Sequence, residues 1–180
     1  MNKLLTLAMF GIVNAALWLA HSAEADEPST AWIVTHYNQF QLVTPTPIPV
    51  DPKIAAACTT SVKPVQLGGP HAESAISIYV NDIAGTALST SSGFEPGAVI
   101  VKLKQRDEQH TRGRNAVGGM VKRDPGYDPS GGDWEYFYLE DGKLESGPLT
   151  SCAQCHAGAG KRDHVFASWI GASTLQQGSH

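Results

Sequence analysis

The sequence predicts an α+β fold that is mostly β, and three observations support this class. The middle of the chain carries four runs rich in β-branched and aromatic residues, some of which alternate between apolar and polar side chains. Glycine and proline, which total 18 and 11 residues, cluster between these runs and favour turns. The segments of helical character are short, and the clearest lies near the C-terminus. A length of 180 residues allows one domain with a substantial core.

Each expected strand is bounded by turn signals. Turns are predicted at 93–97, at 124–133, where Pro, Gly and Asp are dense, and at Asp141-Gly142, a pair typical of β-hairpins. Glycines within the third run weaken it as a strand. The expected strands are residues 75–81, 98–104, 116–122 and 134–140.

The remaining segments are expected to be helical or extended. Residues 31–37 fit a short strand or the first turns of a helix equally well. Thr44–Pro52 contains four prolines, which exclude a regular helix and favour an extended arm. A helix is expected at 151–157, and a second helical piece at 163–169 would be capped by Asp163. Shorter helical segments are expected at 54–58 and 83–88.

Residues 1–25 have the pattern of a secretory signal peptide. Lys3 supplies the positive charge, Leu4–Ala20 is apolar, and Ala23-Glu24-Ala25 fits a cleavage site. An uncleaved membrane anchor is the less favoured alternative, because the apolar run is short and interrupted. The sequence therefore predicts a periplasmic or secreted protein with no membrane attachment after cleavage.

The mature chain is expected to have two parts. Residues 26–70 form an extended Pro-rich N-terminal arm, and residues 71–175 form the folded domain. The net charge of -4 and the isoelectric point near 5.9 provide no basic surface for nucleic acid, so nucleic-acid binding is not expected.

The strongest functional signal is Cys152-Ala153-Gln154-Cys155-His156. The pattern C-x-x-C-H is the attachment signal for c-type haem: both thiols add to the porphyrin vinyl groups and the histidine binds the iron. A structural disulfide or a redox C-x-x-C is less favoured, since the βαβ context of the redox motif is absent. Zinc would need a second ligand pair, and Cys58 is the chain's third and last cysteine. We expect one covalent haem c, held by Cys152, Cys155 and His156.

The late position of this motif narrows the class of cytochrome. Small electron-transfer cytochromes carry it near the N-terminus with a methionine ligand downstream, and no methionine follows His156. A helical-bundle cytochrome would need helical periodicity throughout, which this sequence lacks. Cys58 is then left without an intrachain partner, as a buried thiol or, less favoured, a disulfide between two copies.

Several motifs in fixed order resemble the cytochrome P-460 family, which includes the c-prime-beta cytochromes. They span about residues 71–170 and are specific only in combination. These motifs are Ile78-Tyr79-Val80-Asn81, the run from Phe94 to Lys102, Gly132-Asp133-Trp134, the haem signature, and Asp163-His164-Val165-Phe166.

The resemblance implies an antiparallel sheet with flanking helices, a homodimer and a five-coordinate iron bound by His156. In members that oxidise hydroxylamine, a lysine is covalently joined to the porphyrin edge, and Lys102 stands at the matching position. Lys102 is thus a candidate haem cross-link, with a solvated strand lysine as the alternative.

Two departures from the hydroxylamine oxidisers bear on function. Their distal carboxylate matches Gly118 here, and a distal arginine matches Ile76. Without a carboxylate, general-base catalysis has no evident carrier. An apolar pocket favours a small diatomic or nitrogen-oxide ligand such as NO. Three functions stay open: gas binding, hydroxylamine or NO oxidation, and plain electron transfer to a redox partner protein.

Other side chains are weaker candidates near the iron. Met120 is a possible sixth ligand but fits core packing better. Four histidines could ligate, although each is more typical of a surface or hydrogen-bonded residue: His36, His71, His110 and His164. The acidic pairs Asp107/Glu108 and Asp128/Asp133 fit solvated surface charge. Alternate residues among Trp134, Tyr136, Phe137 and Tyr138 could line the haem pocket.

Overall fold

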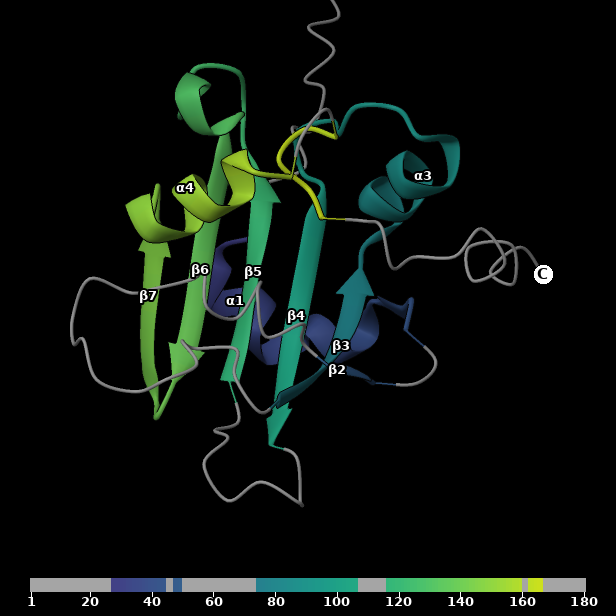
Figure 1. The fold of residues 1–180 in the computed structure, drawn as a ribbon, viewed down its shortest axis with the longest axis vertical. Coiled ribbons are helices and arrows are strands. Elements are labelled where there is room, and N and C mark those ends of the chain that lie inside the picture. Colours follow the sequence, from purple (N-terminus) through teal and green to yellow (C-terminus); the bar gives the residue numbers. More distant parts are fainter. Residues whose placement is uncertain (1–26, 45–46, 50–73, 107–115, 160–161, 167–180) are drawn as a thin grey trace, which may run out of the picture.

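One antiparallel sheet dominates the computed structural model, which describes residues 27–44, 47–49, 74–106, 116–159 and 162–166 (Figure 1). The strand order is β1-β3-β4-β5-β6-β7, and β2 also pairs with β3. The strands are β1 (Gln41–Leu42), β2 (Ile48–Pro49), β3 (Ser74–Val80), β4 (Val99–Arg106), β5 (Ala116–Lys122), β6 (Trp134–Glu140) and β7 (Lys143–Gly147). The α+β class, with its antiparallel sheet and mostly β content, is confirmed.

The described helices are short and lie on both faces of the sheet. They are α1 (Thr30–His36), α3 (Asp82–Thr90) and α4 (Thr150–Ala157), with 3-10 turns η1 (Tyr37–Gln39) and η2 (Pro129–Gly131). Figure 1 shows α4 in front of the sheet and α1 behind it. Within the described ranges, no helix is long and apolar enough to cross a membrane.

Most expected elements are confirmed. The four expected strands correspond to β3, β4, β5 and β6, and the helices expected at 83–88 and 151–157 are α3 and α4. Of residues 31–37, which fitted strand or helix, all but Tyr37 belong to α1, and Tyr37 begins η1. Ser29 Oγ accepts a hydrogen bond from Trp32 N at 3.2 Å and caps this helix. The short helical segment expected at 54–58 lies outside the described residues.

The prediction of a second helical piece at 163–169 is wrong for the part that the structure describes, residues 163–166. Asp163 and His164 have φ of 50° and 63°, in the left-handed region, and Val165 and Phe166 are not helical. Asp163 does not cap a helix. Its carboxylate is bound by the Lys122 ammonium at 2.7 Å, and its carbonyl accepts from Trp134 Nε1 at 2.9 Å. These tertiary contacts override the local tendency.

Strand β7 was not predicted from the sequence, because most of its residues are polar. It forms because the Asp141-Gly142 turn, with φ of 51° and 76°, directs the chain back along β6. Two residues of positive φ suit the twist of a tight hairpin. Charged Lys143 and Glu145 then blunt this edge strand against pairing with other chains.

The two sheet faces pack against different helices. On the first, the α1 face, buried Ile33 and Val34 of α1 contact Val99, Val101 and Phe137. On the second, the α4 face, strand residues pack against α3 and against partly buried residues of α4. The strand residues of this cluster are Ile78, Val80, Ile100, Met120, Trp134 and Tyr136.

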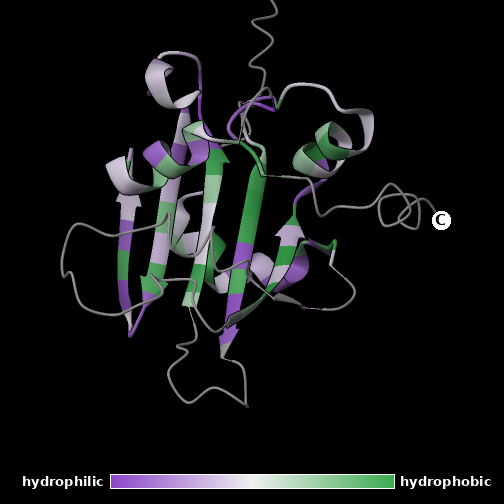
Figure 2. Ribbon diagram, in the orientation of Figure 1, coloured by the Kyte–Doolittle hydropathy of each residue, from purple (hydrophilic) through white to green (hydrophobic). Residues whose placement is uncertain are grey.

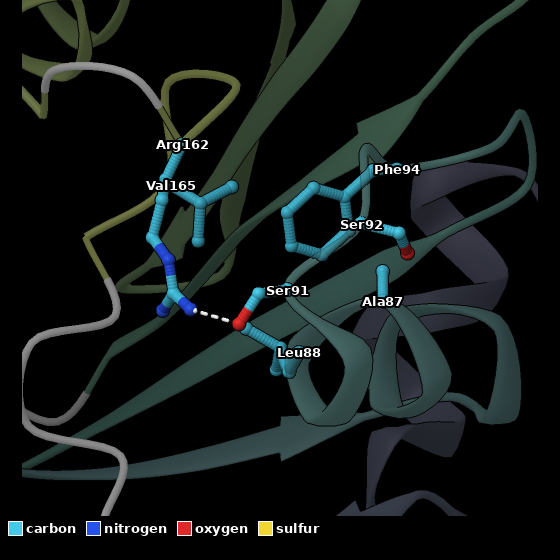
Figure 3. Close-up of a pocket in the computed structure, with 7 residues that line it drawn as sticks. All are labelled: Ala87, Leu88, Ser91, Ser92, Phe94, Arg162 and Val165. Atoms are coloured by element: carbon cyan, nitrogen blue, oxygen red, sulfur yellow. Dashed lines mark hydrogen bonds between the residues drawn. The ribbon is translucent and has the colours of Figure 1, made fainter.

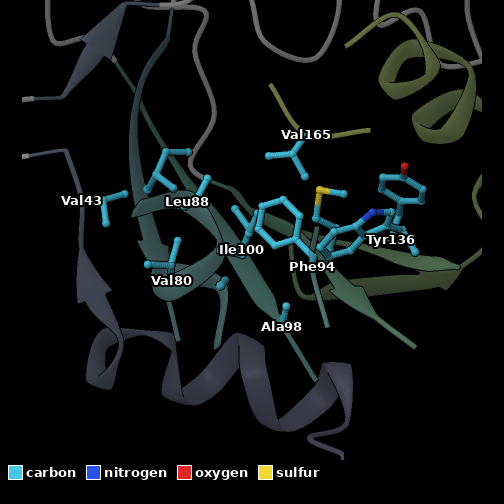
Figure 4. Close-up of a cluster of buried hydrophobic side chains, with 13 residues drawn as sticks. Val43, Val80, Leu88, Phe94, Ala98, Ile100, Tyr136 and Val165 are labelled. Atoms are coloured by element: carbon cyan, nitrogen blue, oxygen red, sulfur yellow. The ribbon is translucent and has the colours of Figure 1, made fainter. Parts of the chain in front are cut away.

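The α4 face holds the larger buried cluster, drawn in Figure 4. Phe94 lies edge-on to Trp134 with ring centroids 5.3 Å apart, and Val165 closes the cluster from the C-terminal segment. Figure 2 shows β4 hydrophobic over its first half and hydrophilic beyond it. The apolar half of β4 lies beneath the cluster. The hydrophilic half begins at Lys102, which lies on the α4 face.

Asn81 joins three elements at one corner of this cluster. Its Oδ1 accepts from Ala84 N at 3.1 Å, which caps α3, and from Val99 N at 2.9 Å at the start of β4. Its Nδ2 donates to the carbonyl of Gly97 at 2.8 Å. Gly97, at φ 82°, is the third residue of a turn closed by Ala98 N and Glu95 O, a position that requires positive φ.

Replacing Asn81 by Ala should lower the free energy of unfolding by about 2–4 kcal/mol, since it removes a helix cap and strands a partly buried N–H and carbonyl. Urea unfolding followed by circular dichroism measures the loss. Ser29→Ala removes a single exposed cap contact and is the matched control, with an expected cost of about 1 kcal/mol. Equal losses in the two variants would contradict the joining role of Asn81.

Candidate functional site

Helix α4 places the residues predicted to attach haem on one side of its surface. Cys152 and Cys155 are three positions apart and His156 is four from Cys152, so all three share a face. Both cysteines are half-buried and are not joined in a disulfide. Cys152 and Ala153 pack against the cluster on the α4 face. Cys58 lies outside the described residues.

His156 is held in one orientation by its surroundings. Its Nδ1 lies 2.8 Å from the carbonyl oxygen of His164. A carbonyl can only accept, so Nδ1 carries the proton and Nε2 keeps the lone pair that a metal needs. The ring lies between Tyr136 and Phe166, with centroid distances of 5.1 and 5.3 Å.

The environment keeps this imidazole neutral. Burial lowers the pKa of His156 to about 4, against the opposing effect of the His164 hydrogen bond, and the positive charge of Lys102 acts in the same direction as burial. Neutral imidazole is the form that binds metals. Burial also raises the pKa of the Cys152 thiol, whereas Ser151 and Lys102 lower it.

Lys102 shares the α4 face with this helix. The register sets Ile78, Lys102, Gly118 and Tyr138 in one cross-strand row, and Ile78 belongs to the cluster on the α4 face. Directly opposite residues of neighbouring strands point to the same side. Because its charge also acts on Cys152 and His156, Lys102 belongs to the same site.

Gly118 and Ile76 also lie on the α4 face. A Cβ atom at Gly118 would be 3.0 Å from Cδ2 of Tyr138, so the Tyr138 ring covers the glycine. Ile76 is half-buried and packs against the cluster. Gly118 thus lies directly beside Lys102, and Ile76 lies one cross-strand row away. These are the two positions at which the sequence departs from the hydroxylamine oxidisers.

The aromatic residues of β6 alternate as expected. Trp134 and Tyr136 are buried on the α4 face, and Phe137 is buried on the α1 face. Burial raises the pKa of Tyr136, with smaller effects from residues that include Cys152 and Cys155. The Tyr136 hydroxyl is buried without a hydrogen-bond partner among the described residues, which leaves a polar atom available beside the cysteines.

The remaining candidate ligands are placed elsewhere or in other roles. Met120 is buried in the core cluster. His36 stacks on Trp32 at 4.4 Å in α1, and α1 packs on the opposite sheet face. His164 contributes its carbonyl to His156. His71, His110 and the pair Asp107/Glu108 lie outside the described residues.

The second acidic pair has structural contacts. Asp133 Oδ1 accepts from the backbone N–H groups of Gly126 and Asp128 at 3.1 and 3.0 Å. Asp128 Oδ1 accepts from Ser130 Oγ at 2.7 Å. Both carboxylates therefore organise the turn that precedes β6.

Sequence reasoning missed the ion pair between Lys104 and Glu140 on the α4 face. Lys104, Ala116 and Glu140 form the row next to Gly118, and the Lys104 ammonium lies 4.0 Å from the Glu140 carboxylate. Lys104 is 5% exposed. Small Ala116 between them is the only sequence signal for this pairing.

Figure 3 shows a small pocket between α3 and the C-terminal segment. Arg162 Nη2 donates to Ser91 Oγ at 2.8 Å across it. Its volume of about 10 Å³ is at the lower limit for one water molecule. This pocket is too small for a cofactor and separate from α4.

The side chains present fit a c-type haem. Two thiols on one helical face, and a neutral imidazole whose Nδ1 is already bound, are the donors that such a haem uses. Lys102, on the α4 face of the sheet, is a further residue of the same site.

Comparison with known proteins places the chain in a family of haem proteins. A search of curated proteins found no match. The family model for cytochrome P460 matches residues 53–167, which include α4, Lys102 and the segment that contacts His156. The chain therefore belongs to the cytochrome P460 family and is a haem-binding cytochrome.

Proposed function

We propose that this protein is a mono-haem c-type cytochrome that binds a small nitrogen oxide, NO above all, at its iron. Cys152 and Cys155 attach the porphyrin and His156 is the proximal ligand. One observation carries the proposal: the His164 carbonyl fixes Nδ1 of His156 and leaves Nε2 as a lone-pair donor on the helical face that carries both thiols.

The residues around His156 give the site its chemical character. When bound, the haem supplies an iron that can change oxidation state and bind a diatomic ligand. The Tyr136 and Phe166 rings contact the imidazole and reduce its exposure to water. At Gly118 the side chain nearest in the row is the aromatic ring of Tyr138, which offers no carboxylate to remove a proton. This composition favours a neutral ligand over a substrate that must be deprotonated.

Hydroxylamine oxidation is the second candidate function. The position of Lys102, whose charge acts on both Cys152 and His156, favours a lysine linked to the porphyrin edge. A carboxylate, Glu140, lies one strand row from Gly118 on the same face, paired with Lys104. Oxidation by this enzyme would need Glu140 to leave that ion pair.

We further propose export to the periplasm after cleavage behind Ala25, transfer of electrons to a redox partner protein, and assembly as a homodimer. The apolar segment Leu4–Ala20 supports export. N-terminal sequencing of the exported protein and light scattering check the cleavage site and the dimer.

Ferrous protein should give an ordinary five-coordinate c-haem absorption spectrum that changes on addition of NO. The reason is that the iron has one strong protein ligand, His156, and no methionine follows it in the sequence. A six-coordinate spectrum that does not respond to NO would contradict gas binding and favour electron transfer. A broadened Soret band shifted far to the red would favour the lysine-linked enzyme.

Replacing both Cys152 and Cys155 by Ala should release all haem under denaturing conditions, because both thioether bonds are lost. Denaturing gel electrophoresis with haem staining measures retention. Haem that stays attached would require another covalent link, and adding Lys102→Met should then release it. Lys104→Met, the other lysine of β4 on the α4 face, is the matched control and should leave retention unchanged.

Gly118→Glu should raise hydroxylamine turnover, by up to roughly 100-fold, the lower end of a general-base contribution. The new Cβ would lie 3.0 Å from the Tyr138 ring, so the ring must turn aside. Gly118→Gln has the same shape without the base and should stay at the wild-type rate. Equal rates in folded Glu and Gln variants would refute a distal position for residue 118.

A further inference from the structure

The segment 162–166 is held to the domain by contacts from each of its residues. Arg162 binds Ser91, Val165 is buried in the core, and the Phe166 ring contacts His156. Between them, Asp163 and His164 adopt left-handed backbone conformations. Two consecutive residues other than glycine in this region cost energy and persist only where surrounding contacts impose them.

Asp163 makes most of the contacts that impose this conformation. Its two carboxylate oxygens accept from the Lys122 ammonium at 2.9 and 2.7 Å. Its Oδ2 also lies 3.4 Å from Phe94 N, and its carbonyl accepts from Trp134 Nε1 at 2.9 Å. Three separate parts of the α4 side of the domain therefore hold one residue.

Lys122 is itself fixed, so the anchor is rigid. Its ammonium also donates to the Gly132 carbonyl at 2.8 Å and lies 5.3 Å from the centre of the Trp134 ring. The Lys122 side chain is 14% exposed and the Asp163 side chain 24%. Partial burial on both sides makes this pair stronger than a surface ion pair.

Glycine at position 132 lets His164 approach this anchor. Gly132 has φ of 70°, and a Cβ atom there would lie 2.6 Å from Cδ2 of His164. The His164 backbone is thereby brought to where its carbonyl meets Nδ1 of His156 at 2.8 Å. One chain of contacts leads from Lys122 through Asp163 to the imidazole.

We propose that the Lys122–Asp163 ion pair positions the proximal ligand: it holds the His164 carbonyl on Nδ1 of His156 and thereby sets the orientation and electron-donating strength of this imidazole toward the iron. The proposal rests on His156 being the haem ligand. Asp163 and Lys122 are positioning residues, since neither touches the imidazole itself. A partner that orients a ligating histidine typically changes metal affinity or activity by roughly 10–100-fold.

The test is resonance Raman spectroscopy of the ferrous holoprotein, which reports the stretching frequency of the bond between iron and histidine. Asp163→Asn and Lys122→Met should each lower and broaden this band, because a weaker hydrogen bond at Nδ1 makes the imidazole a poorer donor. The reduction potential should rise in both variants, since a poorer donor stabilises ferric iron less.

Glu135→Gln is the matched control. Glu135 pairs with Arg123 at 2.6 Å, with side-chain exposures of 14% and 15%, and Arg123 directly follows Lys122 in the sequence. The Arg123 side chain contacts Glu27 instead of segment 162–166. The control should lose comparable stability in thermal unfolding and keep the wild-type iron–histidine band.

The outcomes distinguish failure of the positioning role from failure of His156 as the haem ligand. A wild-type band frequency in Asp163→Asn and Lys122→Met protein that retains haem would overturn the positioning role. An equal shift in Glu135→Gln would overturn it too, because the effect would then follow from lost stability alone. An iron–histidine band that persists unchanged in a His156→Ala variant retaining haem would instead remove His156 as the ligand and the proposed site with it.

Discussion

The hydrogen bond between Nδ1 of His156 and the carbonyl oxygen of His164 is the interaction on which the site depends. It joins the haem-attachment helix to a segment from beyond the helix end, and it selects the tautomer of the imidazole. Without it, the ring contacts of His156 with Tyr136 and Phe166 would not select which ring nitrogen carries the proton. Burial then adds to this selection by keeping the ring neutral.

Backbone conformations that few residues allow occur at two points around the α4 face, and glycine supplies both. Gly97, at φ 82°, completes the turn that starts β4 and offers its carbonyl to Asn81. Gly132, at φ 70°, leaves the space that the His164 ring occupies. Both glycines lie in motifs by which this chain resembles its family. Those motifs therefore contain residues needed for the backbone geometry around α4 as well as the predicted haem donors.

Local patterns were sufficient for four of the strands and insufficient for long-range contacts. Alternation and β-branching located β3 to β6, and the spacing of Cys152 to His156 predicted the haem donors. Residues 163–166 could not be predicted, because the Lys122–Asp163 ion pair that prevents a helix there joins positions 41 residues apart in the sequence. Strand β7 was missed for a similar reason: its polar residues pair because of the Asp141-Gly142 turn, a cause outside the strand.

The same long-range pairs bear on which chemistry the α4 face can perform. In the part of the chain that the structure describes, the partly buried carboxylates of Glu140 and Asp163 on this face are already bound, by Lys104 and by Lys122. A base must take a proton from its substrate, and either carboxylate could do so only by giving up a partly buried ion pair, which leaves its lysine uncompensated. Asp163 would also release the His164 carbonyl and with it the orientation of His156. Ligand binding demands neither change, so the electrostatics of this face favour a cytochrome that binds a neutral molecule over one that deprotonates its substrate.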